Sequence, residues 1–93
     1  LGPEGYLVNV ARGTLVDEAA MLEMLKGWKL GGAALDVFEK EPAMDPGFWE
    51  LDNVVLSPHQ GSATHQTRDK MGDLVVANLV AHFDGEPLLS AVV

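Results

Sequence analysis

The chain has 93 residues, 47% of them hydrophobic, so it is long enough for one small globular domain and too hydrophobic for wholesale disorder. Fourteen acidic and six scattered basic residues give a formal net charge of −8, which argues against a nucleic-acid-binding surface. The sequence has no cysteine, no membrane-spanning stretch and no signal peptide, which excludes a disulfide framework and leads us to expect a cytoplasmic protein.

The first predicted element is a strand over residues 6–10, preceded by turn residues. Its continuous apolar run is typical of a strand buried on both faces of a parallel sheet. Arg12 and Gly13 then stand at its carboxyl end, where open α/β sheets bind ligands. A guanidinium there suits a carboxylate or phosphate. From this stretch alone, an arginine that snorkels to the sheet edge or pairs with a nearby acid is the favoured interpretation.

A helix follows, with Asp17 as its N-cap and Gly27 near its end. Its apolar residues repeat at intervals of three and four, which is typical of an amphipathic helix. The second predicted strand spans residues 31–37 and is rich in small residues, and Asp36 stands at its end. Strand, helix and strand in this order favour a parallel pair joined by a right-handed crossover.

Residues 38–53 are predicted to be irregular and to run over the surface, held in place by Phe48, Trp49 and Leu51. A short third strand over residues 54–56 leads to a turn at 59–62 and then to a long helix over 63–83. The inner face of this helix is predicted to carry Met71, Leu74, Val75, Asn78, Leu79, His82 and Phe83. Two polar residues interrupt this otherwise apolar face. The face and the apolar tail at 88–93 both indicate surfaces that pack against a partner.

Three strands and two helices make half of a typical parallel sheet. The chain begins without a methionine and enters a strand almost at once, so we expect it to be part of a longer protein. On that expectation the strand at 6–10 would be left as an open sheet edge, which favours self-association.

One candidate residue stands at each predicted strand end, namely Arg12, Asp36 and His59, and Glu41 follows in the second loop. Parallel strands would bring these ends to one edge of the sheet. A histidine beside a carboxylate is a tuned acid or base, and an arginine can hold an anionic substrate. This set suits reduction of a 2-oxo acid. Taken singly, each residue is explained as well by a loop histidine, a solvated acid or a turn residue.

At these positions the sequence resembles the C-terminal part of the D-isomer-specific 2-hydroxyacid dehydrogenases, most of all the glyoxylate/hydroxypyruvate reductase branch. The resemblance covers essentially the whole chain, and its spaced motifs are specific in combination. They are Val8-Asn-Val-Ala-Arg-Gly13, Val16-Asp17-Glu18, Gly32-Ala-Ala-Leu-Asp-Val-Phe38, Glu41-Pro42, Ser57-Pro-His59 and Gly61-Ser-Ala-Thr64.

The resemblance implies an α/β fold, the C-terminal half of a Rossmann-type parallel sheet with three strands and two helices. Residues 1–93 would form part of a nicotinamide-cofactor-binding domain, whose helix and tail at 63–93 contact a substrate domain. It further implies an oxidoreductase that uses NAD(H) or NADP(H) on a small 2-oxo or 2-hydroxy acid and forms a homo-oligomer, a dimer. The 93-residue chain alone would be inactive.

The same resemblance implies roles for single residues. Arg12 would bind the substrate carboxylate, His59 would donate the proton in reduction, and Glu41 would pair with His59. The residues implied for cofactor binding are Val10, Ala11, Arg12, Asp36, His59, Gln60 and Gly61, with Asp36 at the nicotinamide end. Gln60 departs from the apolar residue expected at its position.

Two features of such enzymes are absent from these 93 residues: the G-x-G-x-x-G fingerprint and the residue that selects NAD or NADP. A non-catalytic, cofactor-sensing module like the corepressors that resemble this family is the alternative. We predict no metal site, because the spacing of His59, His65 and His82 does not suit one. A hydrolase is disfavoured, because Gly61-Ser62-Ala63 lacks the second glycine of a nucleophile elbow.

Overall fold

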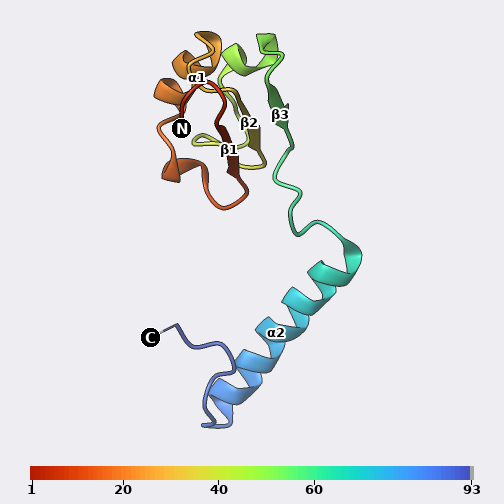
Figure 1. Cartoon of the computed structure of the whole chain (residues 1–93). Coiled ribbons are helices and arrows are strands. Elements are labelled where there is room, and N and C mark those ends of the chain that lie inside the picture. The colour runs from red at the N-terminus through yellow and green to blue at the C-terminus, as the bar shows by residue number, and fades with distance from the viewer. Residues whose placement is uncertain (93) are drawn as a thin grey trace. The chain divides into compact units, whose positions relative to one another are not determined.

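The computed structural model describes residues 1–92, and it comprises two compact units, Leu1–Gly61 and Ser62–Val93. Unit 1 holds a three-stranded parallel sheet of β1 (Tyr6–Asn9), β2 (Gly32–Leu35) and β3 (Val54–Leu56), in that spatial order (Figure 1). Val8 lies opposite Ala34, and Ala34 lies opposite Val55. The predicted α/β class with three parallel strands is confirmed.

Helix α1 (Glu18–Lys26) connects the first two strands and begins where the sequence predicts. The carboxylate of Asp17 accepts the backbone N–H of Ala20 at 2.9 Å, so it caps the first turn. The acidic Glu18 lies in the first turn and the basic Lys26 in the last turn, so each charge lies at the end of the helix where the helix dipole stabilises it. Gly27 is the C-cap.

The core of unit 1 lies between α1 and one face of the sheet. Its buried residues are Met21, Leu22, Leu25, Leu30, Ala33, Leu35 and Phe48. Phe48 comes from the predicted surface segment, where a short 3₁₀ helix, Pro46–Glu50, turns it inward to 1% exposure. The prediction that Trp49 also anchors this segment is wrong, since it is 71% exposed. A 3₁₀ helix turns about 120° per residue, so the residue after a buried one points away.

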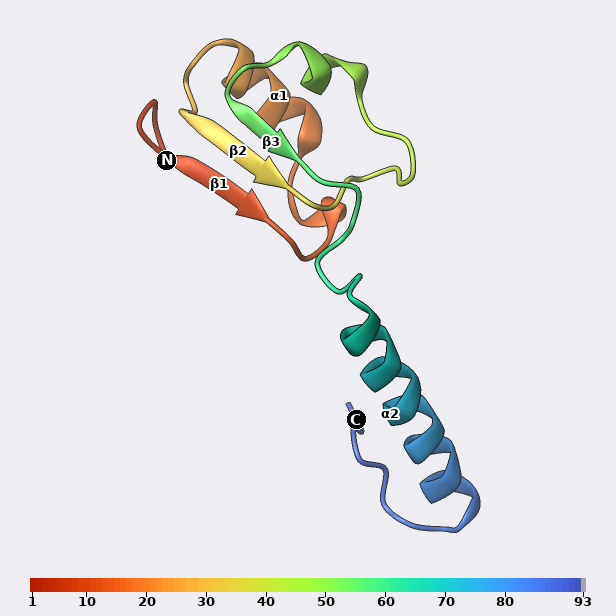
Figure 2. The same cartoon turned by 90° about the vertical axis from the view of Figure 1, so that its right-hand side faces the viewer.

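Strand β1 is buried on one face only, which corrects the prediction of two buried faces. Figure 2 shows α1 packed on one side of the sheet. On the opposite side Tyr6, Val8 and Val55 are 72%, 69% and 68% exposed. Successive residues of a strand face opposite ways, so a single helical layer within unit 1 covers only every second one.

Unit 2 consists of α2 (His65–Phe83) and the segment after it. The helix begins two residues later than predicted, because Thr64 acts as the N-cap and accepts the N–H of Thr67 at 3.2 Å. The tail is tied to the helix by Asn78, which donates to Ser90 Oγ at 2.9 Å and accepts the Ser90 N–H at 3.2 Å. The predicted inner face is not buried within unit 2: Asn78 is half-buried, and the other predicted residues are exposed, namely Met71, Leu74, Val75, Leu79, His82 and Phe83. Over the described residues, neither helix is long and apolar enough to cross a bilayer.

Candidate active site

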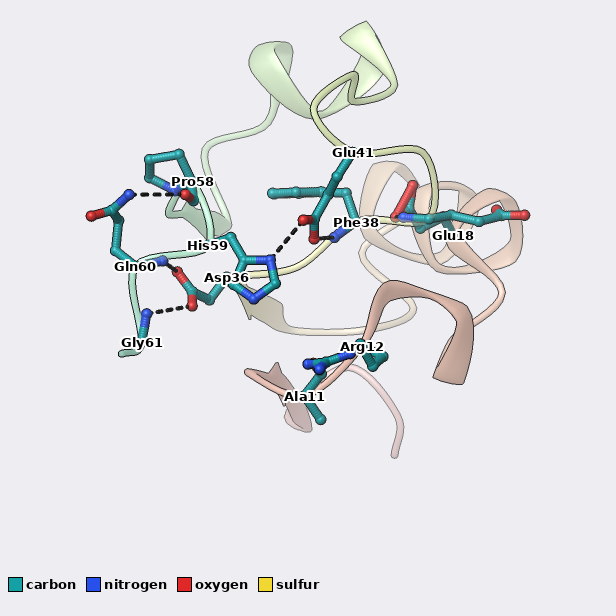
Figure 3. Close-up of polar contacts among 11 residues, drawn as sticks. Ala11, Arg12, Glu18, Asp36, Phe38, Glu41, Pro58, His59, Gln60 and Gly61 are labelled. Atoms are coloured by element: carbon teal, nitrogen blue, oxygen red, sulfur yellow. Dashed lines mark hydrogen bonds and ion pairs between the residues drawn. The ribbon is translucent and has the colours of Figure 1, made fainter. Parts of the chain in front are cut away.

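The carboxyl ends of the three strands form one edge of unit 1, and each carries a predicted site residue. Arg12 follows β1 and precedes a 3₁₀ turn, Gly13–Leu15, while Asp36 follows β2 directly and His59 lies after β3. Figure 3 shows the side chains of Arg12, Asp36, Glu41 and His59 gathered beyond these strand ends. The structure therefore brings together the residues that the sequence predicts to share this edge.

His59 and Glu41 form a direct pair. The imidazole Nδ1 lies 2.6 Å from Glu41 Oε2, and the other carboxylate oxygen, Oε1, accepts the backbone N–H of Phe38 at 3.0 Å. Both carboxylate oxygens are engaged, so the acid is fixed in orientation and in turn orients the ring. The pairing occupies Nδ1 and leaves Nε2 as the ring nitrogen that can face a ligand.

The environment of Glu41 keeps it ionised. The hydrogen bond with His59 is the main cause that lowers the pKa of the Glu41 carboxyl below its ordinary value of 4.5, and the Phe38 N–H bond adds to it. Burial opposes these two hydrogen bonds with a smaller effect, and the charges of His59 and then Arg12 lower the pKa a little further. Because the folded-state pKa is lowered, these contacts stabilise the fold fully above about pH 4.5, and their contribution is lost as the pH falls through the lowered pKa.

Replacing Glu41 by glutamine is expected to remove this acid-side dependence. The amide oxygen can still accept the Phe38 N–H, but the side chain no longer titrates. Urea unfolding midpoints between about pH 3 and 7 should fall less steeply towards acid in E41Q than in the wild type. Glu50→Gln, at an exposed acid of the 3₁₀ helix, is the matched control and should keep the wild-type slope. Equal slopes in wild type and E41Q would contradict the assignment.

The turn that carries Arg12 is held by Asn9, a residue that the sequence analysis did not single out. Asn9 is only 7% exposed at the end of β1. Its Nδ2 donates to the Arg12 carbonyl at 2.9 Å, and its Oδ1 accepts the Ala11 N–H at 3.1 Å. The guanidinium of Arg12 itself donates to the Ala11 carbonyl at 2.6 Å. The sequence signal that could have identified Asn9 is that it is a polar residue within an otherwise apolar strand.

Asn9→Ala is expected to destabilise unit 1 by about 1–3 kcal/mol, because it removes two part-buried hydrogen bonds, each contributing about 0.5–1.5 kcal/mol. Urea unfolding of the variant checks this. Asn78→Ala removes the same side chain from a half-buried position of α2 in unit 2 and should leave the unfolding of unit 1 unchanged. If the two substitutions had equal effects on unit 1, Asn9 would not hold the turn.

Asp36 faces the third strand end. Its Oδ1 accepts the Gln60 N–H at 2.7 Å, and its Oδ2 accepts the Gly61 N–H at 2.8 Å. The Gln60 bond is the largest cause that lowers the pKa of the Asp36 carboxyl below its ordinary value of 3.8. Gln60, the unexpected residue, also donates its side-chain amide to the Pro58 carbonyl at 3.1 Å, so it helps to close the turn.

Two clefts of unit 1 adjoin these residues. One, of about 310 Å³, lies on the exposed sheet face and brings together four residues predicted to bind a cofactor, namely Val10, Asp36, Gln60 and Gly61. The other, of about 620 Å³, is mostly apolar and was not predicted. It is lined by Glu41 and His59 and by Phe38, Pro42, Met44, Trp49, Leu56, Ser57 and Pro58.

Residues 1–61 match the family described as D-isomer specific 2-hydroxyacid dehydrogenase, NAD binding domain. The chain belongs to this family. A hydroxyphenylpyruvate reductase from Plectranthus scutellarioides is 55% identical over 93 residues, all of this chain and 30% of that protein. A glyoxylate/hydroxypyruvate reductase A from Arabidopsis thaliana is 54% identical, again over all of this chain and 30% of its own length.

Among solved structures, the NADPH-dependent glyoxylate/hydroxypyruvate reductase of Sinorhizobium meliloti, in complex with NADP and malonate, superposes with a TM-score of 0.92. It is 47% identical, and the match covers 96% of this chain and 28% of that one. The chain thus spans about 30% of the length of the curated 2-hydroxyacid dehydrogenase relatives that it matches. The resemblance stated from the motifs is confirmed, and so is the expectation of a nicotinamide-cofactor family.

Proposed function

We propose that the protein carrying this chain is an NAD(P)H-dependent reductase that converts a small 2-oxo acid of the glyoxylate or hydroxypyruvate type into the D-2-hydroxy acid. The observation that carries the proposal is the 2.6 Å contact between His59 Nδ1 and Glu41 Oε2 at the sheet edge that also presents Arg12. The names of the relatives support the substrate class.

In this proposal each of the three residues has one task. The Arg12 guanidinium binds the substrate carboxylate by two parallel hydrogen bonds. His59 donates the proton on Nε2 to the substrate carbonyl oxygen as that oxygen becomes a hydroxyl, and solvent then reprotonates the ring. The Glu41 carboxylate stabilises the imidazolium and fixes its orientation through Nδ1. The cofactor, when bound, supplies the hydride.

The residues around the smaller cleft fit the nicotinamide end of such a cofactor. Ala34 and Val55 give it an apolar floor on the exposed sheet face, and Asp36 and Gln60 place polar groups at its rim. A flat, polar-edged ring matches a site of this kind. Val10, Ala11, Arg12, Asp36, His59, Gln60 and Gly61 are the residues that would hold it. The chain has no glycine-rich phosphate fingerprint, so on its own it is expected to bind the cofactor weakly.

The test compares the 93-residue chain with the product of the complete reading frame that encodes it. Oxidation of NADH and NADPH is followed with glyoxylate, hydroxypyruvate and an aromatic 2-oxo acid. We expect turnover by the complete product and none by the chain alone. Cofactor binding without turnover on any substrate would favour the alternative, a cofactor-sensing module. A dimeric state, a cytoplasmic location and contact of residues 63–93 with a substrate domain stay predictions.

A further inference from the structure

His59 has an unusual backbone conformation. Its φ is 56°, in the left-handed region that non-glycine residues rarely occupy, although histidine is tolerated there better than most. Its own N–H bonds to the Ser57 carbonyl at 3.1 Å, which closes a tight turn. Such a conformation persists only where surrounding groups hold it. Its backbone direction also decides where the imidazole points, so whatever holds the turn controls the pair with Glu41.

The groups that hold this turn are the two carboxylate oxygens of Asp36. One binds the N–H of Gln60 and the other binds the N–H of Gly61, the two residues that follow His59. A Cβ added to Gly61 would lie 3.1 Å from Asp36 Oδ2, so the carboxylate and the turn are in close contact. The Asp36 carboxylate therefore holds the turn by charge-assisted hydrogen bonds to two consecutive backbone amides, those of Gln60 and Gly61.

Asp36 is itself a rigid anchor. It is buried at the end of β2, the central strand of the sheet, and its backbone N–H bonds to the Asn9 carbonyl at 3.0 Å. The neighbouring Leu35 carbonyl accepts the Ser57 N–H at 2.9 Å, so the start of the same turn is tied to the same strand. Movement of the His59 turn would break several of these contacts at once.

We propose that Asp36 is a positioning residue that holds the His59 turn in its left-handed conformation and thereby aims the imidazole at Glu41. This role is distinct from a contact with the cofactor, because both oxygens of Asp36 accept backbone N–H groups of the chain itself. The lowered pKa of Asp36 agrees with it, since an ionised carboxylate is the stronger acceptor. Its kinetic consequence rests on the proposed reductase function, whereas its structural consequence does not.

Nuclear magnetic resonance of the cofactor-free 93-residue chain tests the structural part. In the wild type, the amide protons of Gln60 and Gly61 should shift together with the titration of the Asp36 carboxyl carbon. D36N should move both amide signals and speed their hydrogen exchange roughly tenfold. D17N, which alters a helix cap elsewhere, should leave them unchanged. Gln60 and Gly61 amides that ignore the Asp36 titration in the wild type would overturn the proposal, whatever the variant does.

Kinetics of the complete protein test the consequence for the reaction. If Asp36 positions His59, D36N lowers kcat at saturating cofactor and alters the pH profile of kcat. If Asp36 only contacts the cofactor, D36N raises the KM for cofactor and leaves kcat unchanged, which would overturn the proposal. A complete wild-type protein without reductase activity would refute the proposed function alone, and the amide titration would still decide the role of Asp36.

Discussion

Replacing His59 by asparagine is expected to lower kcat/KM for 2-oxo acid reduction by roughly 10²–10⁴-fold in the complete protein, the usual contribution of a positioned general acid. Asparagine is the informative replacement because it tolerates the left-handed backbone that His59 occupies at a φ of 56°, so the turn can survive while the proton donor is lost. A larger or β-branched side chain would confound loss of the donor with loss of the turn.

Steady-state kinetics with saturating NADPH or NADH measure the effect. His65→Asn, at the first residue of α2, is the matched control and should retain wild-type kinetics, because it lies outside the described site. The intact pattern of backbone amide signals in H59N would show that the fold is preserved. An H59N enzyme with near-normal kcat/KM would remove His59 from the reaction.

The second large effect is expected at Gly13, where the segment after β1 passes close to the segment after β2. A Cβ on Gly13 would lie 2.0 Å from the Phe38 carbonyl carbon and 2.4 Å from the Glu39 nitrogen. These atoms are backbone and cannot rotate away. The N–H of Glu39 is also donated to the Glu18 carboxylate at the start of α1, which fixes that segment from the other side.

Gly13→Ala should therefore destabilise unit 1 by about 3 kcal/mol, because the added methyl group forces the two backbones apart. The same movement would separate Arg12 from Glu41. Urea unfolding together with hydrogen exchange of β2 amides measures the loss. A G13A chain with wild-type exchange in β2 would show that the two segments do not pack as described.

Gly72→Ala provides a control with the opposite expected sign. A Cβ on Gly72 would meet nothing within 4 Å apart from the adjacent backbone of its own helix, α2. Alanine there should stabilise the helix by about 0.5–1 kcal/mol, which amide exchange within α2 would report. Glycine-to-alanine substitution is thus expected to destabilise the fold at Gly13, where two backbone segments approach closely, and to stabilise it at Gly72, which is an ordinary helical glycine.

The sequence was sufficient to predict the order of the elements and the edge at which they deliver Arg12, Asp36 and His59. Strand–helix–strand alternation imposes parallel strands, and parallel strands end at the same edge. The N-cap of α1 at Asp17 was also predictable, since it depends only on the preference for aspartate at the residue before a helix. The partnership of His59 with Glu41 was predicted from the shared sheet edge and the chemistry of a histidine beside a carboxylate, and the family resemblance implied the same pair.

Features that depend on three-dimensional packing could not be predicted. The exposure of Trp49 depends on a 3₁₀ turn that buries Phe48 instead, and the exposed face of β1 depends on how many helices cover the sheet. The roles of Asn9 and Asp36 involve hydrogen bonds to backbone groups, which leave no residue-type pattern to recognise. These hydrogen bonds from Asn9 and Asp36 hold the turns that carry Arg12 and His59, the residues that the sequence motifs do reveal.

A double-mutant cycle between Glu41 and His59 tests the central claim most directly, because it asks whether the acid acts through the imidazole. We predict that E41Q lowers kcat/KM of the complete protein roughly 10–100-fold in the wild-type background and has no further effect in the H59N background. If E41Q instead lowered kcat/KM by the same factor in both backgrounds, the two residues would act independently, and the contact at 2.6 Å would not be the basis of the chemistry.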